Sequence, residues 1–526
     1  MNKDKFIELI RQGYTFKGES AVMGAAMLNG EPIEGSVVRL PLKTMNRHGL
    51  IAGATGTGKT KTLQVISESL SDASIPVLLM DIKGDLSGIA APGIPNDKIN
   101  ERYALVGEPY QPTAYPVELL SLSNEKGVRL RATVSEFGPI LLSKILGLND
   151  TQQGLVALIF KYCDDNKLPL LDLKDFTKML QYISNEGKAE VEKEYGKIST
   201  TSTGTILRKV IELQQQGADI FFGEPSFDID DLMRISDDGR GMINVLRVTD
   251  MQNRPKLFST FMLQMLAELY AVLPEEGDMD KPKLVIFIDE AHLVFQEATE
   301  ALLEQVETVI KLIRSKGVGI FFCTQNPQDI PASVLSQLGM KVQHALRAFT
   351  AADRKTIKQA AANYPESEFY KTETLLTELG IGEALITMLN EKGIPTPLVH
   401  TMLISPRSRM DVLSDREIDD LVRRSRLVRK YEETCDSKSA YEILNAKLDE
   451  AVRKSEEEAR KKEEELRRIT EEKERARAAR QPKSTLEKVF ESSTRQVGRT
   501  AASIITRTLL GALGLGGRWS NKKGLF

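Results

Sequence analysis

An eight-residue segment with three glycines, three threonines and a lysine has the composition of a phosphate-binding loop. It reads Gly53-Ala54-Thr55-Gly56-Thr57-Gly58-Lys59-Thr60, continues into Lys61, and fits the pattern G-x-x-x-x-G-K-[ST]. Glycines permit positive φ, so consecutive backbone N–H groups can turn inward around phosphate oxygens. Lys59 would then reach the β and γ phosphates and Thr60 would hold Mg²⁺. We therefore expect residues 53–61 to bind ATP with Mg²⁺.

A second segment ends an apolar run in two acids. Residues 284–288 read Leu-Val-Ile-Phe-Ile and precede Asp289 and Glu290. Such a strand would place both carboxylates at the carboxyl edge of a sheet, where open α/β folds bind ligands. We expect Asp289 to orient the Mg²⁺ shell and Glu290 to act as the base that polarises the attacking water. The alternative is a buried strand that simply reaches solvent.

Polar residues also follow two further apolar runs. Gln325 follows Ile-Phe-Phe-Cys-Thr, and beside the γ phosphate it would sense the nucleotide; the alternative is a plain turn into Pro-Gln-Asp-Ile-Pro. Asp81 ends Pro-Val-Leu-Leu-Met, where a site role and a turn cap are both open. His292 and His344 are expected to be structural, because four scattered histidines form no metal-ligand set.

Phosphoryl transfer often uses an arginine against the developing charge, frequently from a neighbouring subunit. Arg314 and Arg347 are the candidates, because they lie on segments flanking the run that ends at Gln325. The alternative for both is a solvated surface position.

The elements that must position these residues alternate between apolar strands and amphipathic helices, which predicts an α/β fold with a mainly parallel sheet. The charged segment 453–480 predicts a long solvated helix, because acids repeatedly precede bases by four residues. The expected organisation is a short β-rich segment (1–45), two parts of a nucleotide-binding core (46–109 and 241–405) around a helical insertion (110–240), a charged helical extension (415–482) and a basic amphipathic tail (483–526).

Several longer strings together resemble the HerA and FtsK group of P-loop ATPases, most closely its YjgR-like bacterial branch of HerA-like helicases. The resemblance implies a RecA-like core, a ring-shaped and usually hexameric homo-oligomer, ATP bound between subunits, and DNA moved through a central channel. It also implies the roles given above to the loop, Asp289, Glu290, Gln325 and the two arginines. Residues 1–45 are too short for the small β-barrel of HerA itself. The strings are RHGLIAGATGTGKT, FFGEPSFDIDDLM, KPKLVIFIDEAHLVF, LIRSKGVGIFFCTQNPQDIP and LGMKVQHALRAFT.

Composition limits the partners. The 71 basic and 74 acidic side chains give a net charge of -3, so DNA contact must come from a local strip. Three dispersed cysteines and the lack of a long apolar run favour a cytoplasmic protein without a transmembrane segment. We expect a DNA translocase or helicase; a protein-remodelling or secretion-type motor and a nucleotide-timed assembly scaffold are the alternatives. The tail could pack on its own core, dock on a neighbouring subunit, or contact DNA or a membrane surface.

Overall fold

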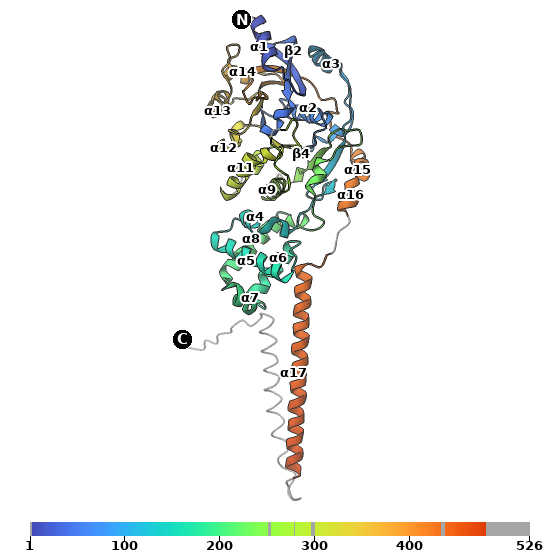
Figure 1. Ribbon diagram of the computed structural model, residues 1–526, viewed down its shortest axis with the longest axis vertical. Helices are drawn as coiled ribbons and strands as arrows, with labels where there is room; N and C mark the ends of the chain where they lie inside the picture. Colours follow the sequence, from blue (N-terminus) through green and yellow to red (C-terminus); the bar gives the residue numbers. More distant parts are fainter. Residues whose placement is uncertain (1–2, 251–253, 278, 296–299, 433–436, 480–526) are drawn as a thin grey trace, which may run out of the picture. The chain divides into compact units, whose positions relative to one another are not determined.

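A twelve-stranded mixed sheet organises the larger of the two compact units, residues 1–445 (Figure 1). The computed structural model describes residues 3–250, 254–277, 279–295, 300–432 and 437–479. The strand order is β2-β1-β12-β11-β10-β3-β9-β8-β4-β7-β5-β6. The strands are β1 (Ser20–Leu28), β2 (Glu31–Pro41), β3 (Gly49–Ala52), β4 (Val77–Asp81), β5 (Val117–Ser121), β6 (Val128–Arg129), β7 (Ile243–Arg247), β8 (Leu284–Ile288), β9 (Val318–Thr324), β10 (Met340–Gln343), β11 (Glu383–Thr387) and β12 (Val399–Leu403).

The strands from β10 to β6 in this order pair in parallel, whereas β11, β12, β1 and β2 pair antiparallel. Every residue of β3, β4, β8 and β9 is buried. A parallel strand covered on both faces needs apolar side chains on both, which explains the unbroken runs in the sequence. The α/β class with a mainly parallel sheet is confirmed.

The helices connect these strands, extend from them or form a separate lobe. Helices α4 to α8 pack on one another and gather in one lobe (teal and green in Figure 1). Capping boxes open α4, α5 and α6, so these helix starts are fixed by local sequence. The helices are α1 (Lys3–Gly13), α2 (Lys59–Asp72), α3 (Asp97–Leu105), α4 (Val134–Ile145), α5 (Asp150–Asn166), α6 (Leu173–Ser184), α7 (Lys188–Tyr195), α8 (Thr200–Gln215), α9 (Pro255–Val272), α10 (His292–Phe295), α11 (Glu300–Ile313), α12 (Ala332–Leu335), α13 (Ala351–Ala362), α14 (Thr372–Glu378), α15 (Asp415–Arg424), α16 (Arg426–Tyr431) and α17 (Ala440–Ala478).

The helical insertion is shorter than the predicted range 110–240. Strands β5 and β6 lie within that range and extend the main sheet beyond β7. Their short apolar runs carry no period that separates a buried strand from a buried helix, and only pairing with β7 decides between them.

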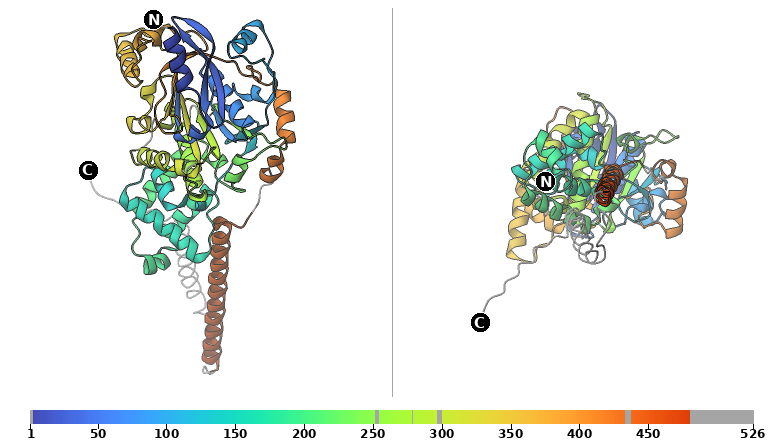
Figure 2. Two further views of the ribbon diagram at one scale, coloured as in Figure 1. Left: turned by 45° about the horizontal axis from the view of Figure 1, so that its top comes forward. Right: turned by 90° about the horizontal axis from the view of Figure 1, so that it is seen from below.

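The amino-terminal segment 1–45 differs from its prediction in two ways. It begins with a helix, α1, whose Phe6 and Ile10 are buried four residues apart. Its hairpin β1–β2 is part of the main sheet, because β1 pairs with β12. Phe6 contacts Phe369, with ring centroids 5.2 Å apart, so α1 closes over the chain just before α14 (dark blue beside orange in Figure 2, left). The predicted boundary at residue 45 is therefore not a domain boundary.

The boundary between the core and the carboxyl-terminal extension also lies at a different residue than predicted. Helix α15 contacts β5 and α16 contacts β6, so residues 415–431 belong to the larger unit, and the second unit begins at Ala446. The predicted charged helix is present as α17, whose described side chains from 449 onward are exposed. The tail 483–526 lies outside the described residues. No helix in the described part of the chain is long and apolar enough to cross a membrane.

Candidate active site

The carboxyl ends of five parallel strands meet at one edge of the sheet. Ala52 of β3 pairs with Thr324 of β9 on one side and with Gln343 of β10 on the other, while Ile288 of β8 pairs with Phe322 of β9 and with Met80 of β4. The phosphate-binding loop therefore starts beside the residue that precedes Gln325, and the two acids follow one strand further along. The register brings the predicted loop, acids and amide to the same edge.

Positive φ angles shape the loop as its sequence predicts. Gly53, Gly56 and Gly58 have φ of 150°, 78° and 115°. A Cβ on Gly53 would lie 2.5 Å from the Cβ of His344, so the loop and the end of β10 approach too closely for any side chain there. Helix α2 begins at Lys59 and directs its amino end at the loop, which favours anions.

The Lys59 side chain folds back into this loop. Its Nζ donates to the carbonyl oxygens of Gly53 at 2.7 Å and Ala54 at 3.2 Å, and the residue is 6% exposed. Burial, together with the nearby Lys83 ammonium, lowers the pKa of Lys59. A buried cation bonded to neutral loop carbonyls is held where phosphate oxygens would offer it full charge compensation.

The oxygens around the first turn of α2 suit Mg²⁺. Asp289 is 4% exposed, and its Oδ2 has no hydrogen-bond partner among the described residues. Burial raises the pKa of Asp289 to about 6, against the opposing effect of Lys83. Mg²⁺ in nucleotide sites takes one or two protein oxygens and completes its shell with phosphates and water. The Asp289 Oδ2 atom, which accepts no hydrogen bond from the described residues, and the half-buried Thr60 at the start of α2 fit that requirement.

Glu290 has the geometry of a functional position. Its φ of 46° lies in the left-handed region, which a non-glycine residue adopts at a cost, and it is 6% exposed. Its Oε2 lies 3.3 Å from His292 Nδ1 and its Oε1 lies 2.5 Å from Lys83 Nζ. Burial alone would raise the pKa of Glu290, but the ion pair with Lys83, together with the nearby His292 and Lys59, holds the pKa below its ordinary value.

Lys83 is a site residue that the sequence analysis missed. It lies on the loop after β4, and its pKa is raised because Asp289 and Glu290 outweigh the effect of burial. Asp81, left open above, caps this loop: its carboxylate accepts from the N–H groups of Gly84, Asp85 and Leu86. The signal was present, because a strand that ends at Asp81 in the same sheet must deliver the next residues to the same edge.

Gln325 lies exposed where β9 ends, between the loop strand and the acid-bearing strand. The next residue, Asn326, caps a short turn by accepting from the N–H of Gln328. Thr324 donates from Oγ1 to Asp329 Oδ2 at 2.6 Å, which fixes the strand end. The turn that was the alternative for this segment therefore begins at Asn326. Gln325 lies just before it, at a position compatible with a nucleotide sensor.

The two arginines lie at different places. Arg347 is exposed after β10, at the same edge as the loop. Arg314 is exposed before β9, at the end of the sheet opposite the glycine-rich loop. His344 is buried, its Nε2 lies 2.9 Å from Thr62 Oγ1, and burial lowers its pKa to about 4. These contacts agree with the structural role expected of this histidine.

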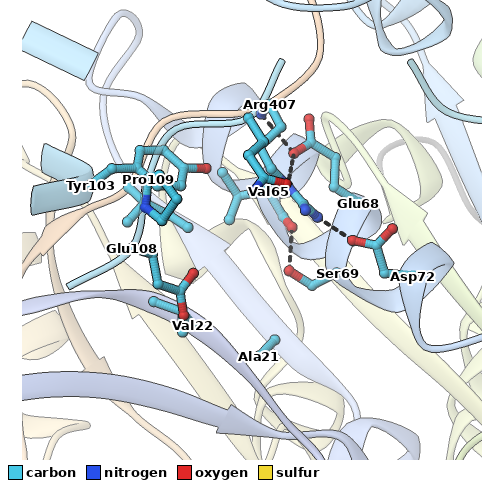
Figure 3. A pocket seen from close by; sticks show the side chains of 12 residues that line it. Ala21, Val22, Val65, Glu68, Ser69, Asp72, Tyr103, Glu108, Pro109 and Arg407 are labelled. Atoms are coloured by element: carbon cyan, nitrogen blue, oxygen red, sulfur yellow. Dashed lines mark hydrogen bonds and ion pairs between the residues drawn. The ribbon is translucent and has the colours of Figure 1, made fainter. Parts of the chain in front are cut away.

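Lys61 directs its side chain away from the loop. Its Nζ donates to the Met410 carbonyl at 2.5 Å and to Gln64 Oε1 at 3.3 Å, so its side chain points toward these groups and its backbone N–H faces the loop motif that it follows. Further along α2, a cavity of about 430 Å³ is lined by Glu68, Asp72 and Arg407 among others (Figure 3). Arg407 pairs with both carboxylates, and these acids make the cavity unsuited to a nucleotide.

Comparison with known families assigns the chain. Residues 27–519 match the family model described as "Helicase HerA-like C-terminal". The chain belongs to this HerA-like family. It is similar to the DNA double-strand break repair helicase HerA of Sulfolobus acidocaldarius, with 22% identity over 66% of this chain and 64% of the relative. It is also similar to the DNA import protein CedB of the same organism, with 24% identity over 68% of this chain and 52% of the relative.

The HerA-like chain spans just under two thirds of the length of the helicase relatives it matches. Among solved structures it is similar to the bacterial conjugative coupling protein TrwB lacking its amino-terminal segment. The TM-score is 0.49 and the identity 14%, over 77% of this chain and 94% of the other.

Proposed function

We propose that this protein is an ATP-hydrolysing motor that moves along or through DNA. One observation carries the proposal: Lys59, the buried Asp289 carboxylate and the strained Glu290 all lie at one edge of the sheet beside a glycine-rich loop. Membership of the HerA-like family and relatives named as DNA helicases and a DNA import protein support DNA as the substrate.

Each residue has a defined part in this proposal. Lys59 and the loop N–H groups bind the β and γ phosphates, and Thr60 with Asp289 holds Mg²⁺, which stabilises charge on the phosphates. Glu290 accepts a proton from the attacking water. Gln325, between the loop and the acids, orients that water or reports its loss. An arginine from another subunit adds positive charge as the leaving phosphate oxygen becomes negative.

Stimulation of the ATPase rate by DNA tests whether the substrate is DNA or protein. Linear double-stranded and single-stranded DNA should raise the ATPase rate of the full chain several-fold, because a motor's hydrolysis is coupled to movement on its track. The Lys59→Ala variant under the same conditions measures the background from contaminating ATPases. A rate unchanged by either DNA, in a preparation that hydrolyses ATP, would favour a protein-remodelling motor or an assembly scaffold instead.

We propose a ring of identical subunits, with Arg347 or Arg314 acting on the nucleotide of a neighbour. Their exposure suits such an interface, and Arg314 lies at the edge opposite its own loop. Arg347→Ala and Arg314→Ala should each be mixed with Lys59→Ala subunits. We expect the arginine variant that is inactive alone to regain part of the activity, since a mixed interface joins an intact loop to an intact arginine.

Mixed assembly must be confirmed by mass, for example with a tagged subunit. Mixed rings with no recovered activity for either arginine would contradict action across the interface.

A further inference from the structure

Lys83 forms an ion pair with Glu290, the carboxylate that is proposed to accept the proton from water during hydrolysis. Its Nζ lies 2.5 Å from Glu290 Oε1 and 3.8 Å from Asp289 Oδ2. A carboxylate paired with an ammonium is a weaker proton acceptor than a free one. In this arrangement the base is therefore held in an inactive pairing.

The Lys83 side chain is placed to leave that pairing. The turn around Asp81 fixes the backbone of its loop through three N–H bonds, whereas the lysine itself is a charge on a flexible four-carbon stem. Its side chain is 32% exposed, in contrast to the buried acids. The ammonium can thus change partner without any movement of β4.

Two lysines belong to loops at the same end of the sheet. Lys59 follows β3 and Lys83 follows β4, and the acids that Lys83 contacts follow β8, which lies between these two strands in the sheet. An anion bound between two like charges relieves their repulsion. A triphosphate that extends from the loop toward the acids would therefore present its γ phosphate to Lys83.

We propose that Lys83 is a latch on the base: it pairs with Glu290 when the site holds no triphosphate and transfers to the γ phosphate when ATP binds. The terminal phosphate would then free the base that hydrolyses it, and ADP would leave the latch closed. This inference rests on the proposed ATPase function and adds a residue that distinguishes ATP from ADP.

Binding of a non-hydrolysable ATP analogue and of ADP, each with Mg²⁺, tests the latch by isothermal titration calorimetry. Lys83→Met should lower the affinity for the analogue roughly tenfold, which corresponds to the loss of one charge-assisted contact. The same variant should change the affinity for ADP by less than about twofold. Lys83→Arg should retain most of the preference for the analogue. Lys193→Met, an exposed lysine on α7, is the matched control and should change neither affinity.

The cost of opening the latch is tested by a double-mutant cycle. Glu290→Gln removes the ion pair, so this variant should bind the analogue more tightly than wild type does. The increase in affinity for the analogue should exceed the increase in affinity for ADP. In the double variant with Lys83→Met this extra gain should disappear, because no ammonium remains to be released.

The proposal would be overturned if Lys83→Met lowered the affinities for the analogue and for ADP equally, or lowered neither affinity. An equal gain in affinity for both nucleotides in Glu290→Gln would also overturn it. If Lys83→Met melts well below wild type, Lys83→Gln replaces it in the same comparison. A wild-type protein that binds neither nucleotide would instead count against the ATPase function itself, which separates the two failures.

Discussion

Lys59→Ala is expected to lose both nucleotide affinity and turnover, with kcat/KM for ATP reduced by at least about a hundredfold. Removing a preorganised charge from a developing transition state costs several kcal/mol, and each 1.4 kcal/mol is about a factor of ten. Lys59 is the cation that the loop itself holds, bonded to the carbonyls of Gly53 and Ala54. Steady-state ATPase assays and calorimetric titration with ATP measure the two losses separately.

The variant also removes a buried side chain, so its thermal unfolding must be compared with that of wild type. Lys193→Ala is the control for loss of a lysine that the structure leaves exposed on α7. Activity of Lys59→Ala within about twofold of wild type, in a folded protein, would reject residues 53–60 as the nucleotide loop.

Glu290→Gln is expected to keep Mg²⁺-ATP bound while hydrolysis falls by roughly a hundredfold to ten-thousandfold, the range that a positioned base contributes. The amide preserves the shape of the carboxylate but cannot accept the proton from water. Glu290 lies in the turn after β8 with φ at 46°, so a residue of the same size is needed to avoid disturbing this turn. Rapid-quench analysis should find intact ATP in the isolated complex.

Asp289→Asn separates this role from metal binding. The Asp289 Oδ2 atom has no hydrogen-bond partner among the described residues, and its replacement should weaken the Mg²⁺ dependence of ATP binding rather than trap ATP. Glu290 would be a structural residue if Glu290→Gln failed to bind nucleotide or hydrolysed it at the wild-type rate.

The site was the part of the protein that local sequence described best. A phosphate-binding loop uses backbone N–H groups within eight consecutive residues, so its glycines and Lys59 can be recognised without knowing any distant contact. Asp289, Glu290 and Gln325 follow uninterrupted apolar runs, and parallel strands necessarily deliver such ends to one edge. The roles assigned to these residues remain predictions for the experiments above.

Features that depend on contacts between residues far apart along the chain could not be predicted from the sequence. The ion pair of Lys83 with Glu290 joins residues 207 positions apart by their numbering, and no local pattern marks it. Whether Asp81 served the site or a turn was decided only by the three N–H groups that surround it. Lys61 directly follows the loop motif, but its Nζ donates to the carbonyl oxygen of Met410, which lies 349 positions further along the chain.

By itself the sequence determined the α/β class, the glycine-rich turn before a helix and the exposed charged helix, because each follows from residues that are close together along the chain. Only the tertiary structure decided that β5, β6 and the amino-terminal hairpin join one sheet, and that Arg314 and Arg347 lie at opposite edges of it. Strand partners and edges are set by which buried surfaces fit together across hundreds of residues. Local periodicity, which reports only that a segment is buried, does not contain that information.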